Sequence, residues 1–158
     1  MGEKASKAEV EFFLSENNFS TYQSVSLPYG LETPGTDKSK YTNFILSSYA
    51  EGKSILDAGT YYGLFPSEAI KLGAVKATGI EYDKERFKIA NRIAQLNGDQ
   101  YNILNGKIEE INISEKFDVV LFLNVLHHVT DPIKAIVKLA SLCRETMIVE
   151  FCLPTDPA

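Results

Sequence analysis

The feature that most constrains the fold is an alternation of short apolar runs and longer amphipathic stretches from residue 54 onward. The strand-like runs are residues 54–58, 75–80, 101–105, 117–123 and 146–153. The stretches with apolar residues at helical spacing are 64–72, 83–98 and 130–143. Such alternation through short loops predicts an α/β fold, in which right-handed crossovers join parallel strands. We therefore predict a Rossmann-like, doubly wound and mostly parallel sheet.

Residues 1–50 have a different character. Residues 1–20 and 41–50 each carry apolar side chains at helical spacing, and the segment between them is rich in Pro, Gly and Thr, with at most one short strand near 24–27. We expect 1–50 to form a helical lid segment and 51–158 to form the ligand-binding core. Tyr22, Tyr29 and Thr33 fold over the site in this hypothesis, although packing alone explains them equally well.

Composition excludes several classes of protein. No apolar run approaches the roughly 18 residues of a membrane span, and the polar start MGEKASKAEVE does not resemble a signal peptide. The net charge of −5 argues against nucleic-acid binding by bulk charge, although a local basic face remains compatible with it. Cys143 and Cys152 are interpreted as buried small side chains in a reducing compartment, and the cysteines and histidines predict no metal site. We expect a cytoplasmic location.

The segment "DAGTYYG", residues 57–63, follows the first predicted strand. Ligands of doubly wound sheets lie beyond the carboxyl ends of the strands where the strand order reverses. Gly59 allows a tight turn there and Gly63 close packing at the helix start, whereas Tyr61 occupies the position where a glycine would admit a pyrophosphate.

A cofactor without phosphate needs no glycine at that position. We predict S-adenosyl-L-methionine, with its carboxylate at the helix N-terminal amides, its amine at backbone carbonyls or Asp57, and Thr60 and Tyr61 in the pocket wall. The alternative is a bare strand-turn-helix without ligand.

Two further segments predict nucleoside contacts. Glu81 ends the "ATGIE" run, 22 residues after Gly59, where a carboxylate can accept hydrogen bonds from both ribose hydroxyls. Tyr82 follows it in the predicted pocket, and Asp83 is a candidate cap of the next helix. A solvated surface charge is the alternative for Glu81.

In "NGKIEEI", residues 105–111, Ile108 can cover one face of adenine and Glu109 can accept from its exocyclic amine. The alternative for this segment is a turn followed by a weak helix.

Together, "ILDAGTYYGLFPSEAIKLGA", "ATGIEYDKERFKIA", "NGKIEEI" and "FDVVLFLNVLHHVTDPIKAI" resemble the class I S-adenosylmethionine-dependent methyltransferases. Within that superfamily the chain looks most similar to the branch around the tRNA wobble-uridine carboxymethyltransferases. The branch motif D-[IV]-G-x-x-x-G-[FY]-F-S-F-E-A, in which a non-glycine middle residue is common, is matched by Asp57, Gly59, Gly63, Phe65, Ser67, Glu68 and Ala69. The resemblance implies seven strands, and the last two are missing here, so we expect either a fragment or a minimal form.

The block "VLHHVTDP" is similar to the V-L-Y-H-x-x-x-P block of that branch, with His128 in place of its histidine and His127 in place of its tyrosine. Asn124, at the end of a predicted strand, would point at the reactive centre or at the methionine moiety. His128 titrates in the right range for a general base toward an oxygen nucleophile, or else it is a structural residue that caps the next helix. Lys107 stands where the branch often has an acid in its adenine loop.

Three functions are compatible with these patterns. The leading hypothesis is methyl transfer to a small molecule, a sugar or a lipid-like acceptor. Methylation of RNA rests on family analogy alone. The third is a non-catalytic binding module, and a homodimer or partner chain would cover the open edge of the last strand. A nicotinamide enzyme is least favoured, because Tyr61 does not suit a dinucleotide.

Overall fold

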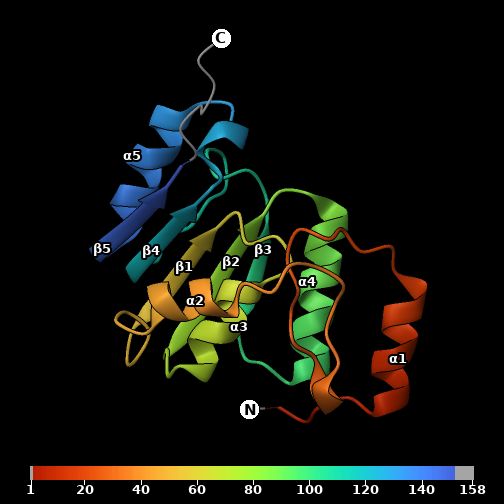
Figure 1. The fold of residues 1–158 in the computed structure, drawn as a ribbon. Helices are drawn as coiled ribbons and strands as arrows, with labels where there is room; N and C mark the ends of the chain where they lie inside the picture. The colour runs from red at the N-terminus through yellow and green to blue at the C-terminus, as the bar shows by residue number, and fades with distance from the viewer. Residues whose placement is uncertain (1, 152–158) are drawn as a thin grey trace.

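The computed structural model describes residues 2–151, which build one parallel sheet with helices on both faces (Figure 1). The strands are β1 Ser54–Ala58, β2 Lys76–Glu81, β3 Asn102–Asn105, β4 Phe117–Leu123 and β5 Cys143–Glu150. The helices are α1 Lys7–Glu16, α2 Ser39–Leu46, α3 Leu64–Lys71, α4 Lys84–Asn97 and α5 Pro132–Leu142, with single 3₁₀ turns at Pro28–Gly30 and Leu126–His128. The predicted α/β sheet is confirmed.

The sheet order is β3-β2-β1-β4-β5, and all neighbouring pairs are parallel. The chain moves outward from β1 to β3 and then returns to the other side of β1 with β4. The order therefore reverses beside β1, and its carboxyl end is the place where such a sheet holds a ligand.

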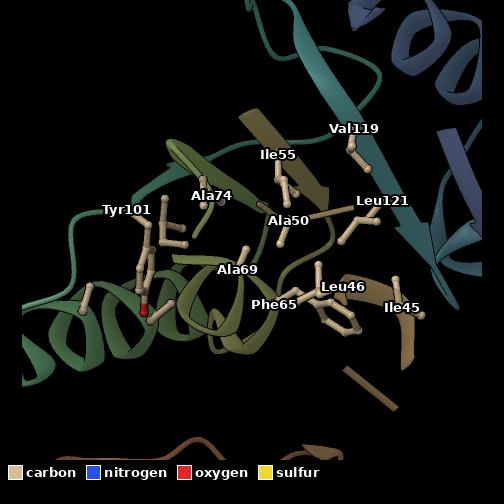
Figure 2. Close-up of a cluster of buried hydrophobic side chains, with 14 residues drawn as sticks. Ile45, Leu46, Ala50, Ile55, Phe65, Ala69, Ala74, Tyr101, Val119 and Leu121 are labelled. Carbon is tan, nitrogen blue, oxygen red and sulfur yellow. The ribbon is translucent and has the colours of Figure 1, made fainter. Parts of the chain in front are cut away.

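Two apolar layers explain why β1 is buried along its whole length. Ile55 points into a layer with α2, α3 and α4, which Figure 2 shows together with Phe65, Val119 and Leu121. Its neighbour Leu56 points to the opposite layer, which α5 covers. Because both faces are covered, the strand sequence is continuously apolar rather than alternating.

Local signals set the helix ends as the sequence predicts. The Asp83 side chain accepts hydrogen bonds from the backbone N–H groups of Glu85 and Arg86, and Gly98 ends α4 in a left-handed conformation. Asp131 is the N-cap of α5 and Pro132 is its first residue. These caps set where the two helices begin or end, and the apolar contacts of α4 and α5 place them on opposite faces of the sheet.

The last strand starts earlier than predicted. The interval 146–153 is wrong at its beginning, because β5 covers Cys143–Glu150 and follows α5 directly. Arg144 and Glu145 fall between the predicted helix and the predicted strand, but in the structure they lie within β5 and form ion pairs with Asp118 and Lys53. Cys143 is half-buried with a free thiol, whereas the prediction for Cys152 lies outside the described residues.

Residues 2–50 pack on the α4 side of the sheet. Val10 and Phe13 of α1 share an apolar cluster with Ile93 and Leu96 of α4. The strand considered near 24–27 is only a single bridge between Ser26 and Glu32. The division into 1–50 and 51–158 stays a prediction. No helix within residues 2–151 is long and apolar enough to cross a bilayer.

Candidate functional site

Three cavities lie at the carboxyl ends of β1, β2 and β4, and Gly59 lines all of them. The α2-side cavity, about 330 Å³, is lined by Tyr22, Gln23, Lys38, Tyr41, Asp57, Gly59, Thr60, Tyr61, Phe65, Leu123, Asn124 and Glu150. The central cavity, about 390 Å³, is lined by Ser20, Tyr22, Gly59, Tyr61, Glu81, Tyr82, Arg86, Leu123, Asn124, Val125 and His128. The β3-side cavity, about 170 Å³, is lined by Gly59, Ile80, Tyr82, Gly106, Lys107, Ile108, Glu109, Val125, His128, Val129 and Thr130. Their shared lining residues make them one elongated site.

The loop after β1 has the tight geometry that its glycines predict. Gly59 has φ 89°, and a Cβ there would lie 2.5 Å from Cγ2 of Val125. The N–H groups of Gly59 and Thr60 both donate to the Ile80 carbonyl at 2.9 Å, which ties the loop to β2. Gly63 has φ 81° and precedes α3. The loop backbone therefore approaches the cavities without side chains in the way at position 59.

Tyr61 adopts a left-handed backbone with φ 59°, unusual for a bulky residue. Its N–H donates to Oε2 of Glu81 at 2.9 Å, which helps to hold this conformation. The ring lies 5.0 Å from that of Tyr22 and 4.5 Å from the guanidinium carbon of Arg86, centroid distances typical of stacking. Tyr61 thus forms a wall between the α2-side and central cavities.

Glu81 is almost fully buried, with 3% of its side chain exposed. Its two oxygens accept from the N–H groups of Tyr61 and Asp83, both at 2.9 Å, and Arg86 lies 4.0 Å away. Burial raises the pKa of Glu81, and these two N–H groups and Arg86 oppose that rise in part. A carboxylate has about four acceptor positions, so capacity for two more donors remains on the central cavity.

Asp57 presents a different carboxylate to the α2-side cavity. Its Oδ2 is buried and finds no hydrogen-bond donor within residues 2–151. Burial raises the pKa of Asp57 to about 7; the nearby Thr60 hydroxyl lowers it in part, although the two groups are not in hydrogen-bonding geometry, and the charge of Glu81 raises it. A buried acceptor without a donor is costly, so the site fits a ligand that brings an ammonium group.

The β3-side cavity is a mainly apolar slot. The Ile80, Ile108, Val125 and Val129 side chains line it, and Ile108 is itself buried. Glu109 lies at its rim, where Oε1 accepts from the N–H groups of Thr130 and Asp131 at 2.8 and 3.2 Å. One Glu109 oxygen is therefore already used to hold the backbone of the segment that leads into α5. The slot has the apolar walls that a flat heterocycle needs.

The two residues considered for catalysis both line the central cavity, and each also lines one of the other two. Asn124, φ 56°, follows β4, lines the α2-side and central cavities, and its side-chain amide donates to the Tyr22 hydroxyl at 3.5 Å. His128 lines the central and β3-side cavities, with its ring centroid 3.9 Å from that of His127. Burial, followed by the charges of His127 and Arg86, lowers the pKa of His128. His128 does not cap α5, because Asp131 does.

Of the residues predicted to form a lid, only Tyr22 lines a cavity. Tyr29 is 59% exposed and its hydroxyl donates to the Ala5 carbonyl, whereas buried Thr33 accepts from the Val25 N–H. These two hold the segment in shape. Tyr62, the neighbour of Tyr61 in the loop, is buried and its hydroxyl accepts from the Ser20 N–H.

Among the lining residues that sequence reasoning missed, four have titratable side chains, namely Lys38, Tyr41, Arg86 and Glu150. The Tyr41 hydroxyl donates to the Glu150 carboxylate although the residues are 109 positions apart. The sequence did contain a signal for Arg86 as a lining residue, because Arg86 lies one helical turn after Asp83 and faces the same end of the sheet. No local pattern predicts the other three.

The strand order, the helix arrangement and the loop after β1 define a class of protein. The fold is that of the class I S-adenosylmethionine-dependent methyltransferases. The chain belongs to the family described as methyltransferase domain, which matches residues 35–158.

Similarity to individual proteins agrees with this assignment. A ubiquinone biosynthesis O-methyltransferase of Haemophilus ducreyi is 33% identical over 91 residues, 54% of this chain and 38% of that protein. A ribosomal protein L11 methyltransferase of Dictyoglomus thermophilum is 35% identical over 71 residues, 45% of this chain and 23% of that protein. The chain spans less than half the length of these relatives.

Solved structures show the same fold at low identity. The N-terminal domain of EvdMO1, crystallised with S-adenosylhomocysteine and D-fucose, superposes with TM-score 0.72 at 17% identity, covering 91% of this chain and 64% of that one. The Synechocystis magnesium protoporphyrin IX methyltransferase with bound S-adenosylmethionine gives 0.57 at 22% identity, covering 66% and 53%.

Proposed function

We propose that the chain binds S-adenosylmethionine across the three cavities and transfers its methyl group to a small-molecule acceptor. The observation that carries the proposal is the pair of buried carboxylates beside the Gly59 loop. Asp57 has an oxygen that lacks a donor, and Glu81 keeps acceptor capacity on the neighbouring cavity. An ammonium group and a ribose diol are the donors that these two acceptors need.

The residues that line each cavity determine which part of the cofactor we assign to it. Asp57 would hold the methionine amine, Glu81 the ribose hydroxyls, and the slot with Ile108 the adenine. Tyr82 would close the ribose side, and the second Glu109 oxygen would accept from the adenine amine. Thr60 and Tyr61 would form the wall beside the methionine chain, and Gly63 admits the close approach of α3.

When bound, S-adenosylmethionine supplies a methyl group on a positively charged sulfur, which is an electrophile without further activation. The chain's task is then to position the two reactants and exclude water. Asn124, between the α2-side and central cavities, would position them. His128 would accept a proton from an oxygen or nitrogen acceptor, and its lowered pKa keeps it neutral and available as a base at pH 7.

Small-molecule acceptors are favoured by the sizes of the cavities and by the names of the relatives, several of which are O-methyltransferases. The tRNA wobble-uridine branch, a homodimer and a partner chain over the edge of β5 remain sequence-based proposals.

Calorimetric titration tests the cofactor directly. S-adenosylmethionine and S-adenosylhomocysteine should bind the chain, whereas NAD should not. Glu81→Ala should weaken binding of both sulfur nucleosides at least tenfold, since hydrogen bonds to a charged group contribute about 1.5–3 kcal/mol. Glu85→Ala, a substitution of an exposed carboxylate in the first turn of α4, four residues after Glu81, is the matched control. Equal affinity of the two variants would refute the assignment of Glu81.

A further inference from the structure

One end of the α2-side cavity is not explained by the proposed cofactor contacts. Asp57 and Gly59 lie at the sheet, but Lys38, Tyr41 and Glu150 come from the start of α2 and the end of β5. These three side chains bring one cation, one phenol and one carboxylate into a cavity of about 330 Å³, a size typical of small-molecule sites.

Among the described residues that line that cavity, Lys38 is the single cationic one. Its Nζ lies 3.5 Å from the centroid of the Tyr22 ring, and it forms no ion pair with a carboxylate of residues 2–151. The lysines that do form ion pairs have exposed side chains, for example Lys53 with Glu145. A half-buried ammonium that faces a cavity without a carboxylate partner is suited to bind an anionic group of a ligand.

Tyr41 and Glu150 form the second polar feature. The Tyr41 hydroxyl donates to Oε2 of Glu150. Burial, and then Glu150 itself, raises the pKa of Tyr41, so the phenol stays neutral. Because its proton is used toward Glu150, the Tyr41 oxygen and the remaining carboxylate positions are all acceptors. The pair is therefore complementary to a ligand hydroxyl that donates.

Aromatic rings complete the walls between these features. Tyr22, Tyr61 and Phe65 line the same cavity, and the Tyr41 and Phe65 rings meet edge to face with centroids 5.9 Å apart. Rings of this kind favour a flat ligand through stacked and edge contacts.

We propose that the end of the α2-side cavity formed by Lys38, Tyr41 and Glu150 is the acceptor site and selects an aromatic hydroxy acid, whose carboxylate binds Lys38 and whose hydroxyl binds the Tyr41–Glu150 pair. The assignment of this ligand as the methyl acceptor rests on the proposed function, but the binding of such a ligand does not. The hydroxyl bound at the Tyr41–Glu150 pair is an anchor and not the proton donor to His128, because His128 lines the central and β3-side cavities but not this one.

Calorimetry with two probes tests the proposal on the full chain. The probes are protocatechuate, an aromatic dihydroxy acid, and catechol, the same ring without its carboxylate. Lys38→Gln should weaken the binding of protocatechuate at least tenfold, which is the loss expected for one charge-assisted hydrogen bond. The affinity for catechol should stay the same within about twofold. Lys40→Gln, a substitution of an exposed lysine on the same helix, should change neither.

Tyr41→Phe should weaken both probes by a similar factor of about five, because a neutral hydrogen bond contributes about 1 kcal/mol. Absence of protocatechuate binding, or equal losses of both probes in Lys38→Gln, would overturn the acceptor assignment. Binding of S-adenosylhomocysteine is measured in parallel. If it fails while protocatechuate binds, the proposed cofactor is wrong and the acid site stands.

Discussion

A Glu81→Gln substitution changes one buried carboxylate into a carboxamide of nearly the same shape. Glu81 accepts hydrogen bonds from the backbone N–H groups of Tyr61 and Asp83 at 2.9 Å each. The carboxamide oxygen can replace only one of these acceptors. Its NH₂ group then faces the other N–H, which leaves a buried donor without a partner.

The expected cost follows from these two bonds. A hydrogen bond to a charged group contributes about 1.5–3 kcal/mol, and a stranded buried donor costs about 1–3 kcal/mol. Removal of a buried charge, whose desolvation raises the pKa of Glu81, offsets part of this loss. We expect a net destabilisation of about 2 kcal/mol, which lowers Tm by about 4–8 °C in a chain of this length.

The same substitution weakens the proposed ribose contact, so the dissociation constant of S-adenosylhomocysteine should rise at least tenfold. Thermal unfolding and calorimetry on one preparation measure both effects. Glu85→Gln, at an exposed position paired with Lys88, should shift Tm by less than about 2 °C, as surface substitutions change stability by at most about 0.5 kcal/mol. Unchanged Tm and affinity in Glu81→Gln would refute the reasoning.

Three further substitutions test separate features. Because burial raises the pKa of Asp57 to about 7 from an ordinary 3.8, the folded state holds its proton more tightly, and the stability gained in this way is fully present below about pH 4 and lost as pH rises to 7. The free energy of unfolding of Asp57→Asn relative to the wild type should therefore rise by up to about 4 kcal/mol between pH 4 and pH 8. A difference between the two proteins in urea unfolding that stays constant across that range would contradict this prediction. Gly59→Ala places a Cβ 2.5 Å from Val125 and should lower Tm and abolish S-adenosylhomocysteine binding, whereas Gly52→Ala, with a similar φ of +70° but nothing within 4 Å, should lower Tm only. Tyr101→Phe removes a buried hydroxyl that has no partner within residues 2–151, so chemical denaturation should show equal or greater stability, by up to about 1 kcal/mol, and a clear loss would show that the hydroxyl is satisfied.

The sheet could be predicted because its signals are local. The run "FDVVLFL" is apolar on both faces of β4, and Asp83 and Gly98 bound α4 by capping. The start of β5 could not be predicted in this way. Arg144 and Glu145 belong to the strand because β5 pairs with β4 from Phe117–Cys143 onward, and the two residues lie at the irregularity between that pair and Val119–Thr146. Their ion pairs with Asp118 and Lys53 also reach distant segments, and no window around residue 144 contains that information.

The residues of the site also divide into those that local sequence signals predict and those that depend on tertiary packing. Asp57, Glu81 and Asn124 lie at or just after strand ends, and parallel strands bring such positions to one edge, so their presence at the cavities was predictable. Lys38 and Tyr41 reach the α2-side cavity only because α2 packs against the sheet beside β5. That contact spans 109 residues to Glu150 and depends on tertiary packing.

The left-handed backbone of Tyr61 has a consequence for how such loops are recognised. At this position the chain demands a backbone angle and tolerates a large side chain, since the ring extends away between two cavities. A sequence pattern that requires glycine at this position selects the residue that adopts a positive φ at the lowest energetic cost. Such a pattern excludes chains in which neighbouring contacts hold another residue at the same φ. A pattern written in dihedral angles would retain them, and a designer could use the position to place an aromatic ring beside a ligand without rebuilding the loop.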